Sequence, residues 1–582
     1  MKKRKKSTSL TSPQVLTARA KGHINAGRLK QAAQCYKKLL SITPNDFTLY
    51  NQLGVIYDRL REWKQAALWY RKAVEQQPEM AAAHYNLANV LHQQGKDNEA
   101  IKTYQKTLAI DKYNLAAWNN MAAILYNQGR MTETLTCFKK AMEVFPDNSG
   151  LHSACLAALN YIPGVDRAEE TQAAKEWWLK HGKGQRCRYI FTNSAAPERI
   201  LRVGIVSADF RDHSVSSFLR PLLRNYDPQQ ITIFCYANVS TPDSVTAELK
   251  SLSPYWRDIN NFDTSRAVQI IMNDRIDILI DLTGHMTGGR LDIFACQAAP
   301  LQMSWLGYPN TTGLPTIHYR LTDHETDPPA DSDPFYTETL LRLPAFLCYE
   351  PPALDIYPAE PPCLRHKYIT FGSLNNPAKI SPPLIELWAA VLKKTPDSRL
   401  LLKGVGFDHQ EARERIRRLF TLHNIQADRL LFRGYTPSRS EHLLVYNQVD
   451  IALDTIPYNG TTTTFEALWM GVPVITMRGD RHAARVGATI MGRIGGAEFC
   501  AVHREEYVTL SFNLARNTKR LQKLRQELRS RLLSSDFCRP ASFCRQFENT
   551  CRLIWQQWCA KTAQRAPKWG FSPKVGENSS GK

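Results

Sequence analysis

Residues 449–477 read VDIALDTIPYNGTTTTFEALWMGVPVITM, a pattern that predicts a strand, a loop, a helix and a second strand. Four consecutive threonines, Thr461 to Thr464, stand where the helix is expected to begin. Hydroxyl groups and free backbone N–H groups at a helix start attract anions, and the helix dipole adds to this attraction. Glu466 lies just inside the helix, where a carboxylate beside a diphosphate can accept both ribose hydroxyls. The alternative interpretation is a helix cap followed by a surface glutamate.

The residues around this segment extend the pattern into an α/β lobe that begins near residue 367. KYITFGSLNN (367–376) predicts a strand whose loop ends near Lys379, and PPLIELWAAVLKKTP (382–396) predicts an amphipathic helix. Further strands are expected at SRLLLKGV (398–405) and RLLFRGY (429–435). Alternating strands and helices predict a doubly wound sheet, which binds ligands beyond the carboxyl ends of its strands.

An earlier α/β region begins near residue 198. ILRVGIVSADF (200–210) reads as a buried parallel strand, and RAVQIIMNDR (266–275) as a helix leading into the strand IDILIDLTGH (276–285). His213 and His285 each come just after a strand, where ligands of such sheets bind. Two histidines at matching strand ends indicate a functional role, although single histidines are more often structural.

The N-terminal quarter repeats with a period of 34 residues. Its aligned columns are aromatic (Tyr36, Tyr70, Tyr104, Phe138), small (Ala20, Gly54, Ala88, Ala122) and turn-forming (Gly27, Gly95, Gly129, with Arg61 as the exception). Paired helices of this period resemble the tetratricopeptide repeat, and such repeats stack into a superhelix with a concave groove. Amides at Gln52, Asn86 and Asn120 are either groove residues that hold an extended peptide or ordinary surface groups.

Composition narrows the classes of partner. The 582 residues contain 75 Lys and Arg against 54 Asp and Glu, a formal net charge of +21, which predicts an anionic partner. We expect no nucleic acid, because helix-turn-helix, RRM and zinc-finger patterns are missing. The sequence has no secretory signal and no run of about 18 apolar residues, so no membrane span is expected. Its 13 cysteines form no C-x-x-C pair, so we expect reduced thiols and a cytoplasmic protein.

No metal site is predicted. Asp331-Ser332-Asp333 spells D-x-D, a known manganese-binding signature, but it lies in a proline-rich stretch and does not follow a strand. A solvated loop is the favoured interpretation of this motif.

Two α/β lobes with functional loops at their strand ends suggest a ligand in the cleft between them, as in GT-B glycosyltransferases. Five motifs then resemble glycosyltransferase family 41, which contains the protein O-GlcNAc transferases and the SPINDLY proteins. They are GIVSADFRDHSVSSF (204–218), DLTGH (281–285), WLGYPNTTGLPT (305–316), FGSLNNPAKISP (371–382) and the segment at 449–477. The resemblance covers about 14–560. It implies an α-solenoid of tetratricopeptide repeats followed by an α/β GT-B glycosyltransferase with two Rossmann-like lobes.

We expect six consecutive segments on this basis. They are a basic tail (1–13), an array of about four repeats (14–148), a helical bridge (149–195), an N-terminal catalytic lobe (196–365), a C-terminal nucleotide-sugar lobe with a closing helix (366–562) and a flexible tail (563–582).

The resemblance implies an inverting, metal-independent transfer of one sugar to Ser or Thr hydroxyls of proteins. His213 matches a proposed base or acceptor-site group, and Lys379 matches the lysine that contacts the diphosphate. The positions that the resemblance assigns to contacts with the nucleotide sugar are Asn376, Arg439, His442, Thr461, Thr462, Thr463 and Glu466. The strand-end argument adds His285 to the catalytic residues.

The donor stays open between UDP-GlcNAc and GDP-fucose. Thr461 stands where the O-GlcNAc transferases carry histidine and Glu466 where they carry aspartate, and the motifs GYPNTTGLPT and NGTTTT look closer to SPINDLY. No cofactor beyond the nucleotide sugar is expected. Acceptor proteins held in the repeat groove are the expected partners, and the repeats also permit an oligomer.

Three other functions are compatible with parts of the sequence. The main one is a repeat scaffold with an inactive transferase module, although Lys379, His213 and the threonines argue against lost activity. A nucleic-acid-binding protein and a transferase acting on small molecules or lipids are weaker, because the first lacks a motif and the second leaves the repeats without a purpose.

Overall fold

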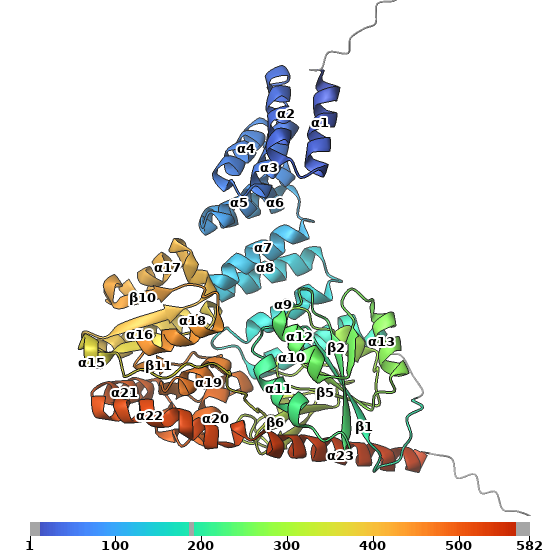
Figure 1. The fold of residues 1–582 in the computed structure, drawn as a ribbon, viewed down its shortest axis with the longest axis vertical. Helices are drawn as coiled ribbons and strands as arrows, with labels where there is room; N and C mark the ends of the chain where they lie inside the picture. Colours follow the sequence, from blue (N-terminus) through green and yellow to red (C-terminus); the bar gives the residue numbers. More distant parts are fainter. Residues whose placement is uncertain (1–11, 186–190, 566–582) are drawn as a thin grey trace, which may run out of the picture.

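The computed structural model describes residues 12–185 and 191–565 (Figure 1). Apart from residues 12–13 and 563–565, the two predicted tails lie outside these ranges. A helical array at the top of Figure 1 leads into two α/β lobes side by side below it. This is the predicted fold class: an α-solenoid followed by a GT-B plan with two parallel sheets.

The array consists of four helical hairpins. Its helices are α1 (Pro13–Asn25), α2 (Leu29–Ile42), α3 (Phe47–Arg59), α4 (Trp63–Gln76), α5 (Ala81–Gln93), α6 (Asp97–Ile110), α7 (Leu115–Asn127) and α8 (Met131–Val144). The turn column needs a left-handed residue: Gly27, Gly95 and Gly129 have φ between 69° and 74°, and Arg61 reaches the same region at φ 58°. Arg61 therefore departs from the column in residue type while it keeps the conformation of the turn.

The small column allows the helices of each hairpin to approach. Ala20, Ala88 and Ala122 have no exposed surface. A Cβ atom added to Gly54 would lie 2.4 Å from a ring carbon of Tyr70, itself only 1% exposed. A methyl group at this position therefore forces a buried aromatic side chain to move.

We expect Gly54→Ala to lower the thermal midpoint, because overpacking costs about 1–3 kcal/mol and outweighs the gain in helix propensity. Gly22→Ala is the matched control, since an added Cβ there meets nothing within 4 Å. Circular dichroism melts of the full chain measure both variants. Equal or higher midpoints for Gly54→Ala would contradict the close approach.

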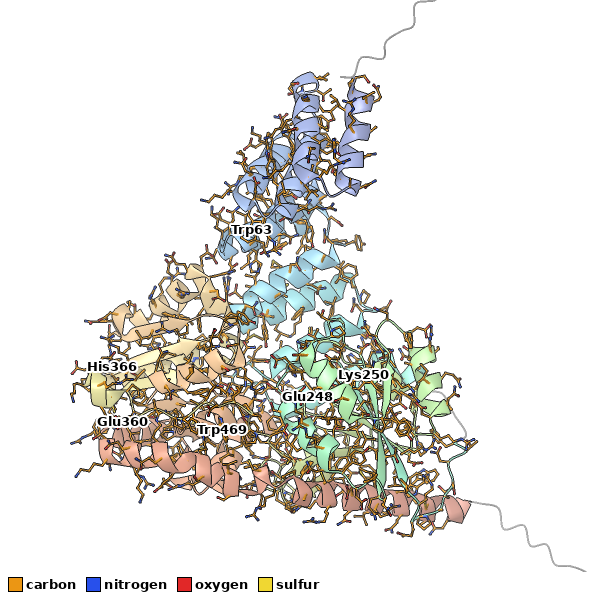
Figure 2. The ribbon with its side chains drawn as sticks, viewed as in Figure 1. Trp63, Glu248, Lys250, Glu360, His366 and Trp469 are labelled. Atoms are coloured by element: carbon orange, nitrogen blue, oxygen red, sulfur yellow. The ribbon has the colours of Figure 1, made fainter. Side chains whose placement is uncertain are left out.

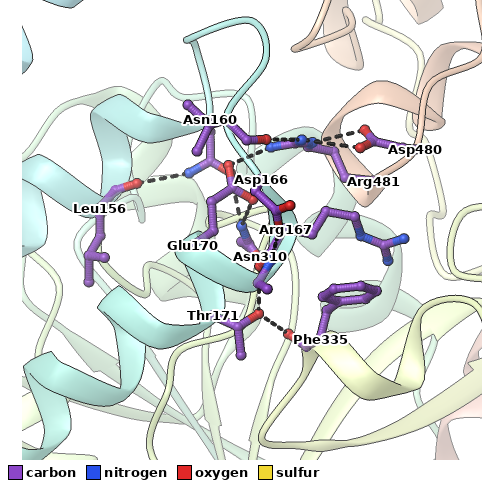
Figure 3. Close-up of polar contacts among 12 residues, drawn as sticks. Leu156, Asn160, Asp166, Arg167, Glu170, Thr171, Asn310, Phe335, Asp480 and Arg481 are labelled. Atoms are coloured by element: carbon purple, nitrogen blue, oxygen red, sulfur yellow. Dashed lines mark hydrogen bonds and ion pairs between the residues drawn. The ribbon is translucent and has the colours of Figure 1, made fainter.

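A helical bridge connects the array to both lobes. It contains α9 (Ser149–Leu159) and α10 (Arg167–Trp177). Glu170 of α10 lies at the centre of the polar junction in Figure 3: it pairs with Arg481 of the second lobe at 2.6 Å and accepts a hydrogen bond from Asn310 of the first lobe at 3.0 Å. The bridge thereby contacts both lobes through one carboxylate.

The first lobe has a seven-stranded parallel sheet in the order β3-β2-β1-β4-β5-β6-β7. Its strands are β1 (Leu201–Ser207), β2 (Ile231–Ala237), β3 (Tyr255–Asp258), β4 (Ile278–Asp281), β5 (Leu301–Ser304), β6 (Tyr319–Asp323) and β7 (Thr339–Leu343). Its longer helices are α11 (Ser216–Asn225), α12 (Ser244–Leu252) and α13 (Thr264–Asn273), with the short α14 (Leu291–Ala295). The strand order reverses between β1 and β4, so the loop carrying His213 begins at the switch point.

The second lobe repeats this logic with six strands in the order β10-β9-β8-β11-β12-β13. They are β8 (Thr370–Ser373), β9 (Arg399–Lys403), β10 (Leu430–Arg433), β11 (Ile451–Leu453), β12 (Val474–Met477) and β13 (Cys500–Ala501). The helices are α15 (Cys363–His366), α16 (Pro382–Lys394), α17 (Gln410–Thr421), α18 (Arg439–Leu444), α19 (Thr462–Trp469), α20 (Val486–Arg493), α21 (Arg504–Ala515) and α22 (Thr518–Ser534). The switch point lies between β8 and β11, which places the loops of Lys379 and of the four threonines next to each other.

The last helix, α23 (Pro540–Arg565), runs back from the second lobe along the first, as the red helix at the bottom of Figure 1 shows. Arg552 donates to the carbonyl oxygens of Pro197 and Arg199, and Phe543 stacks on Trp305. One contiguous apolar core passes through both lobes and this helix, and side chains fill the layers between sheets and helices (Figure 2). Of the helices in the described ranges, none has the length and apolar character needed to cross a membrane.

Candidate active site

A cavity of about 460 Å³ lies where the two switch points face each other. Loops from both lobes line it, and the last repeat and the bridge add two tyrosines. The lining includes Tyr126, Tyr161, Asp209, Arg211, His213, Asn375, Asn376, Lys379, Tyr458, Thr461, Thr462, Thr463 and His482. The structure thus brings six of the predicted site residues to one cavity: His213, Asn376, Lys379, Thr461, Thr462 and Thr463.

Lys379 supplies a positive charge on the second-lobe wall. Its Nζ donates to the carbonyl oxygen of Asn459 at 2.7 Å and lies 4.1 Å from the centre of the Tyr458 ring. Burial lowers the pKa of this amine to about 8, although the nearby Asp454 carboxylate opposes the shift. An amine held by one carbonyl and one ring retains N–H donors for an anion in the cavity.

Asp454 follows β11 directly and organises the loop that holds Lys379. Its carboxylate accepts hydrogen bonds from the backbone N–H groups of Thr455 and Gly460 and from the Thr476 hydroxyl, at 2.7–2.8 Å. Burial raises its pKa to about 6 despite these donors. Sequence reasoning missed this role, although an aspartate at the end of a buried strand was visible in the segment at 449–477.

The threonine run begins helix α19 as predicted. Thr461 is the N-cap residue, and the hydroxyl of Thr463 donates to Oδ1 of Asn375 at 3.0 Å. Thr464 turns away from the cavity and donates to the Gly460 carbonyl oxygen at 3.0 Å. The first N–H groups of a helix have no partner within it, so this end of the cavity favours a negatively charged group.

His213 stands on the first-lobe wall. Its Nδ1 lies 3.5 Å from Oδ1 of Asp209, and its side chain keeps 37% of its surface exposed. Burial lowers the pKa of His213 and raises that of Asp209, while the two groups attract each other. Because its pKa is lowered, the imidazole is largely neutral at neutral pH and able to accept a proton.

Glu466 forms a second cluster beside the cavity. Its carboxylate accepts from His442 Nε2 at 3.0 Å and lies 3.6 Å from Arg439, and the other ring nitrogen of His442 lies 2.9 Å from Lys403 Nζ. Arg439 also donates to Ser217 of the first lobe at 3.4 Å. Arg439, His442 and Glu466, all three predicted to contact the nucleotide sugar, therefore lie together. Lys403, at the carboxyl end of β9, belongs to the same cluster and was not predicted from the sequence.

His285, expected among the catalytic residues from its place after a strand, does not line this cavity. Its ring is 2% exposed, with Nε2 2.9 Å from the Thr312 carbonyl oxygen and Nδ1 3.0 Å from the Ser153 hydroxyl. Burial lowers its pKa to about 3. Helix α9 of the bridge covers the end of β4, so this histidine packs between bridge and lobe on the wall of a second cavity of about 660 Å³.

We therefore expect His285→Leu to lower stability and to leave nucleotide binding unchanged. Unpaired partners at Ser153 and Thr312 cost about 1–3 kcal/mol. Calorimetric titration with UDP and GDP, together with thermal melts, separates the two effects. A large loss of nucleotide affinity in the folded variant would restore the catalytic assignment.

His482 is a cavity residue that the sequence analysis missed. It follows β12, and its Nδ1 lies 2.7 Å from Oδ2 of the buried Asp327 in the first lobe. Its place after a parallel strand was the available signal. The aspartates of the D-x-D motif contact arginines instead: Asp331 lies 2.8 Å from Arg485, and Asp333 lies 3.0 Å from Arg342.

Known protein families match the repeat array and the two lobes separately. Models of the tetratricopeptide repeat match residues 24–60, 62–95, 88–129 and 115–148. The family model described as glycosyl transferase family 41 matches residues 183–348 and 361–547, more than half of the chain. These matches confirm the resemblance drawn from the motifs.

Relatives and a solved structure agree with this result. A protein of Petunia hybrida named "Probable UDP-N-acetylglucosamine--peptide N-acetylglucosaminyltransferase SPINDLY" is 36% identical over 424 residues, which cover 72% of this chain and 45% of that protein. The SEC protein of Arabidopsis thaliana is 30% identical over 62% of this chain and 38% of its own length. This chain thus spans a little under half of the SPINDLY relative that it matches. The structure of a Thermobaculum terrenum O-GlcNAc transferase variant superposes with a TM-score of 0.71 at 30% identity, covering 97% of this chain and 100% of that one. By its motifs, its two facing switch points and these matches, the chain belongs to glycosyl transferase family 41.

Proposed function

We propose that this protein transfers a single sugar from a nucleotide sugar to Ser or Thr hydroxyls of proteins, by an inverting reaction that needs no metal. The observation that carries the proposal is the arrangement of one cavity. Lys379 and the start of α19 lie on its second-lobe wall, and His213 with Asp209 lies on its first-lobe wall.

In this reaction the acceptor oxygen attacks C1 of the sugar while the bond from C1 to the diphosphate oxygen breaks. Lys379 and the N–H groups at Thr462 and Thr463 stabilise the negative charge that develops on the leaving diphosphate. The acceptor proton passes to a base on the opposite wall, and His213 is the group placed there. Arg439, His442 and Glu466 orient the nucleoside end.

The second cavity supports a protein acceptor. It is lined by α7, α8, α9 and the first lobe, and it shares Tyr126, Tyr161, Met286 and Thr287 with the first cavity. A polypeptide that leaves the repeats can therefore reach the sugar through adjoining cavities.

We expect Ala154→Trp, which fills the second cavity, to abolish transfer to protein acceptors and to leave hydrolysis of the nucleotide sugar within about twofold of the parent. Ala168→Trp is the control, since Ala168 lies on α10 outside both cavities. Transfer to acceptors and donor hydrolysis are measured side by side with radiolabelled donor. Equal loss of both activities would mean that the second cavity serves the fold and not the acceptor.

The donor is identified by thermal shifts with UDP, GDP, UDP-GlcNAc and GDP-fucose. A bound ligand at 100 times its Kd stabilises the native state by about 2.7 kcal/mol, so one base should raise the midpoint and the other should not. UDP-GlcNAc is the first candidate, because the Petunia and Thermobaculum relatives carry that activity in their names. GDP-fucose is the second, because Thr461 and Glu466 replace the residues of the O-GlcNAc transferases. No stabilisation by any of the four would favour the scaffold alternative.

A further inference from the structure

Three metal-ligand side chains meet away from the active site, at the junction of the repeat array with the second lobe. His92 lies in the last turn of α5, Asp97 is the first residue of α6, and His409 directly precedes α17. Among residues 12–185 and 191–565, they are the one group of three or more His, Cys, Asp or Glu side chains whose ligand atoms all lie within 4.8 Å of one another.

Both histidines contact the same carboxylate, and the ligand atoms of the three residues lie within 4.8 Å of one another. Nδ1 of His92 lies 2.6 Å from Oδ1 of Asp97, and Nδ1 of His409 lies 2.9 Å from Oδ2 of the same carboxylate. A tetrahedral zinc ion with bonds near 2.0–2.1 Å separates its donors by about 3.3 Å. The rings therefore need to move outward by a few tenths of an ångström. They have the room, because both side chains are about one third exposed and line a cavity of about 130 Å³.

The backbone and a neighbouring amide hold the group in place. Gly95, with φ of 74°, makes the turn that sets His92 and Asp97 side by side. The Asp97 side chain is only 5% exposed and accepts from Nε2 of Gln128 at 3.3 Å, an outer contact of the kind that orients metal-binding carboxylates. A water molecule can complete a four-ligand set, since the Asp408 carboxylate on the same cavity wall already accepts a hydrogen bond from the backbone N–H of Tyr435 at 3.1 Å.

We propose that His92, Asp97 and His409 bind a divalent transition metal, with Zn²⁺ the best match to two imidazoles and one carboxylate. Two ligands belong to the third repeat and one to the second lobe, so the ion clamps the array to that lobe. The other polar contacts at this junction are few: Asn98 N–H to Glu411, Arg415 to the Gln128 carbonyl oxygen, and Asn376 to the Tyr126 hydroxyl. The bound metal would fix the angle at which the array presents a polypeptide to the cavities. Metal binding does not depend on the proposed donor or acceptor, whereas the role in presenting a polypeptide rests on the proposed function.

The test is metal binding by the full chain, without an affinity tag and after treatment with a chelator. Titration calorimetry with ZnCl₂ and the visible spectrum of the Co²⁺ form should show one tight site per chain. His409→Gln should weaken Zn²⁺ binding by more than about 100-fold, since even the loss of an outer contact costs 10–100-fold. Gln128→Ala should weaken it by at least about 10-fold. His503→Gln is the control, because that side chain is 66% exposed at the N-cap of α21, outside the cluster.

Asp97→Asn provides a second variant with the fold checked by circular dichroism. Loss of the tight site in both His409→Gln and Asp97→Asn, with native spectra, supports the proposal. Two results would overturn it: no tight site in the parent protein, or equal Zn²⁺ affinity in the parent and His409→Gln. In either case the cluster is a set of hydrogen bonds and nothing more.

Discussion

Lys379→Met is expected to lower kcat/KM for sugar transfer by about 100- to 1,000-fold, the range found when one donor to a developing oxyanion is removed. The lysine lies on the wall where the diphosphate is expected, and its buried amine has few competing partners. Methionine keeps most of the side-chain volume and removes the charge. A single-turnover assay with labelled donor measures the effect, with circular dichroism to confirm the fold.

The pH dependence gives an independent measurement of the same group. Because burial lowers the pKa of Lys379 to about 8, the amine is charged below that pH and loses its proton above it. The kcat/KM for the donor reports the free enzyme, so it should fall as pH rises through about 8. Lys379→Arg keeps its charge throughout, and its lower activity should lack this fall.

Lys393→Met is the control for lost charge, since Lys393 is exposed on the same lobe. It should change kcat/KM by less than about twofold. Parent-like activity in Lys379→Met would remove Lys379 from the catalytic residues. If neither the parent protein nor the variant hydrolyses or transfers a sugar, the result supports the alternative of a repeat scaffold with an inactive transferase module.

Arg481→Met is expected to destabilise the junction of Figure 3 by about 3–5 kcal/mol, the cost of leaving one partner of a buried ion pair without the other. The Arg481 side chain is 10% exposed and that of Glu170 is 4% exposed. Arg481 also donates to the Val165 carbonyl oxygen at 2.5 Å, and Glu170 holds Asn310 of the first lobe. Loss of the guanidinium therefore loosens the bridge and both lobes together.

Burial holds the pKa of Glu170 above its usual value even with Arg481 in place. In Arg481→Met the pKa of Glu170 should rise further, because the neighbouring positive charge is gone. The folded variant then holds a proton on Glu170 that it must release as pH rises, so its stability should fall with increasing pH. Thermal melts across pH and hydrogen exchange of α10 measure this trend. A second substitution, Glu170→Gln in the Arg481→Met background, removes the unpaired buried charge and should recover part of the lost stability.

Asp480→Asn is the matched control at this junction. Asp480 contacts the same guanidinium at 3.0 Å but is 62% exposed, so its removal should cost less than about 1 kcal/mol. If Arg481→Met melts like the parent and α10 exchanges at the parent rate, the ion pair contributes nothing to the union of the lobes.

Features that depend on neighbouring residues were predicted well. The 34-residue period identified the hairpins because each helix must bury the same face against the next repeat. Lys379 and Thr461–Thr463, which the family resemblance assigned to the donor site, line one cavity because loops at the switch point of a parallel sheet converge. Even Arg61, which breaks the glycine column, adopts the left-handed turn that the column predicts.

Features that depend on packing between distant segments were missed. His213 and His285 look alike in sequence, yet α9 covers His285 and leaves His213 open to the cleft. Lys403 joins His442 across 39 residues, and His482 joins Asp327 across 155. Contacts between residues so far apart in the sequence leave no local sequence pattern.

The sequence by itself determined the repeat array, the two parallel sheets and the helix start at the threonine run, because periodicity, strand ends and helix starts are local properties of the chain. The tertiary structure decided which side chains share the cavity and which pair with each other. Helix α9 of the bridge buries His285. Glu170 of the bridge pairs with Arg481 of the second lobe, and His92 and Asp97 of the repeats contact His409, hundreds of residues away in the sequence. Those outcomes follow from desolvation and contact, and both arise only when the segments pack together.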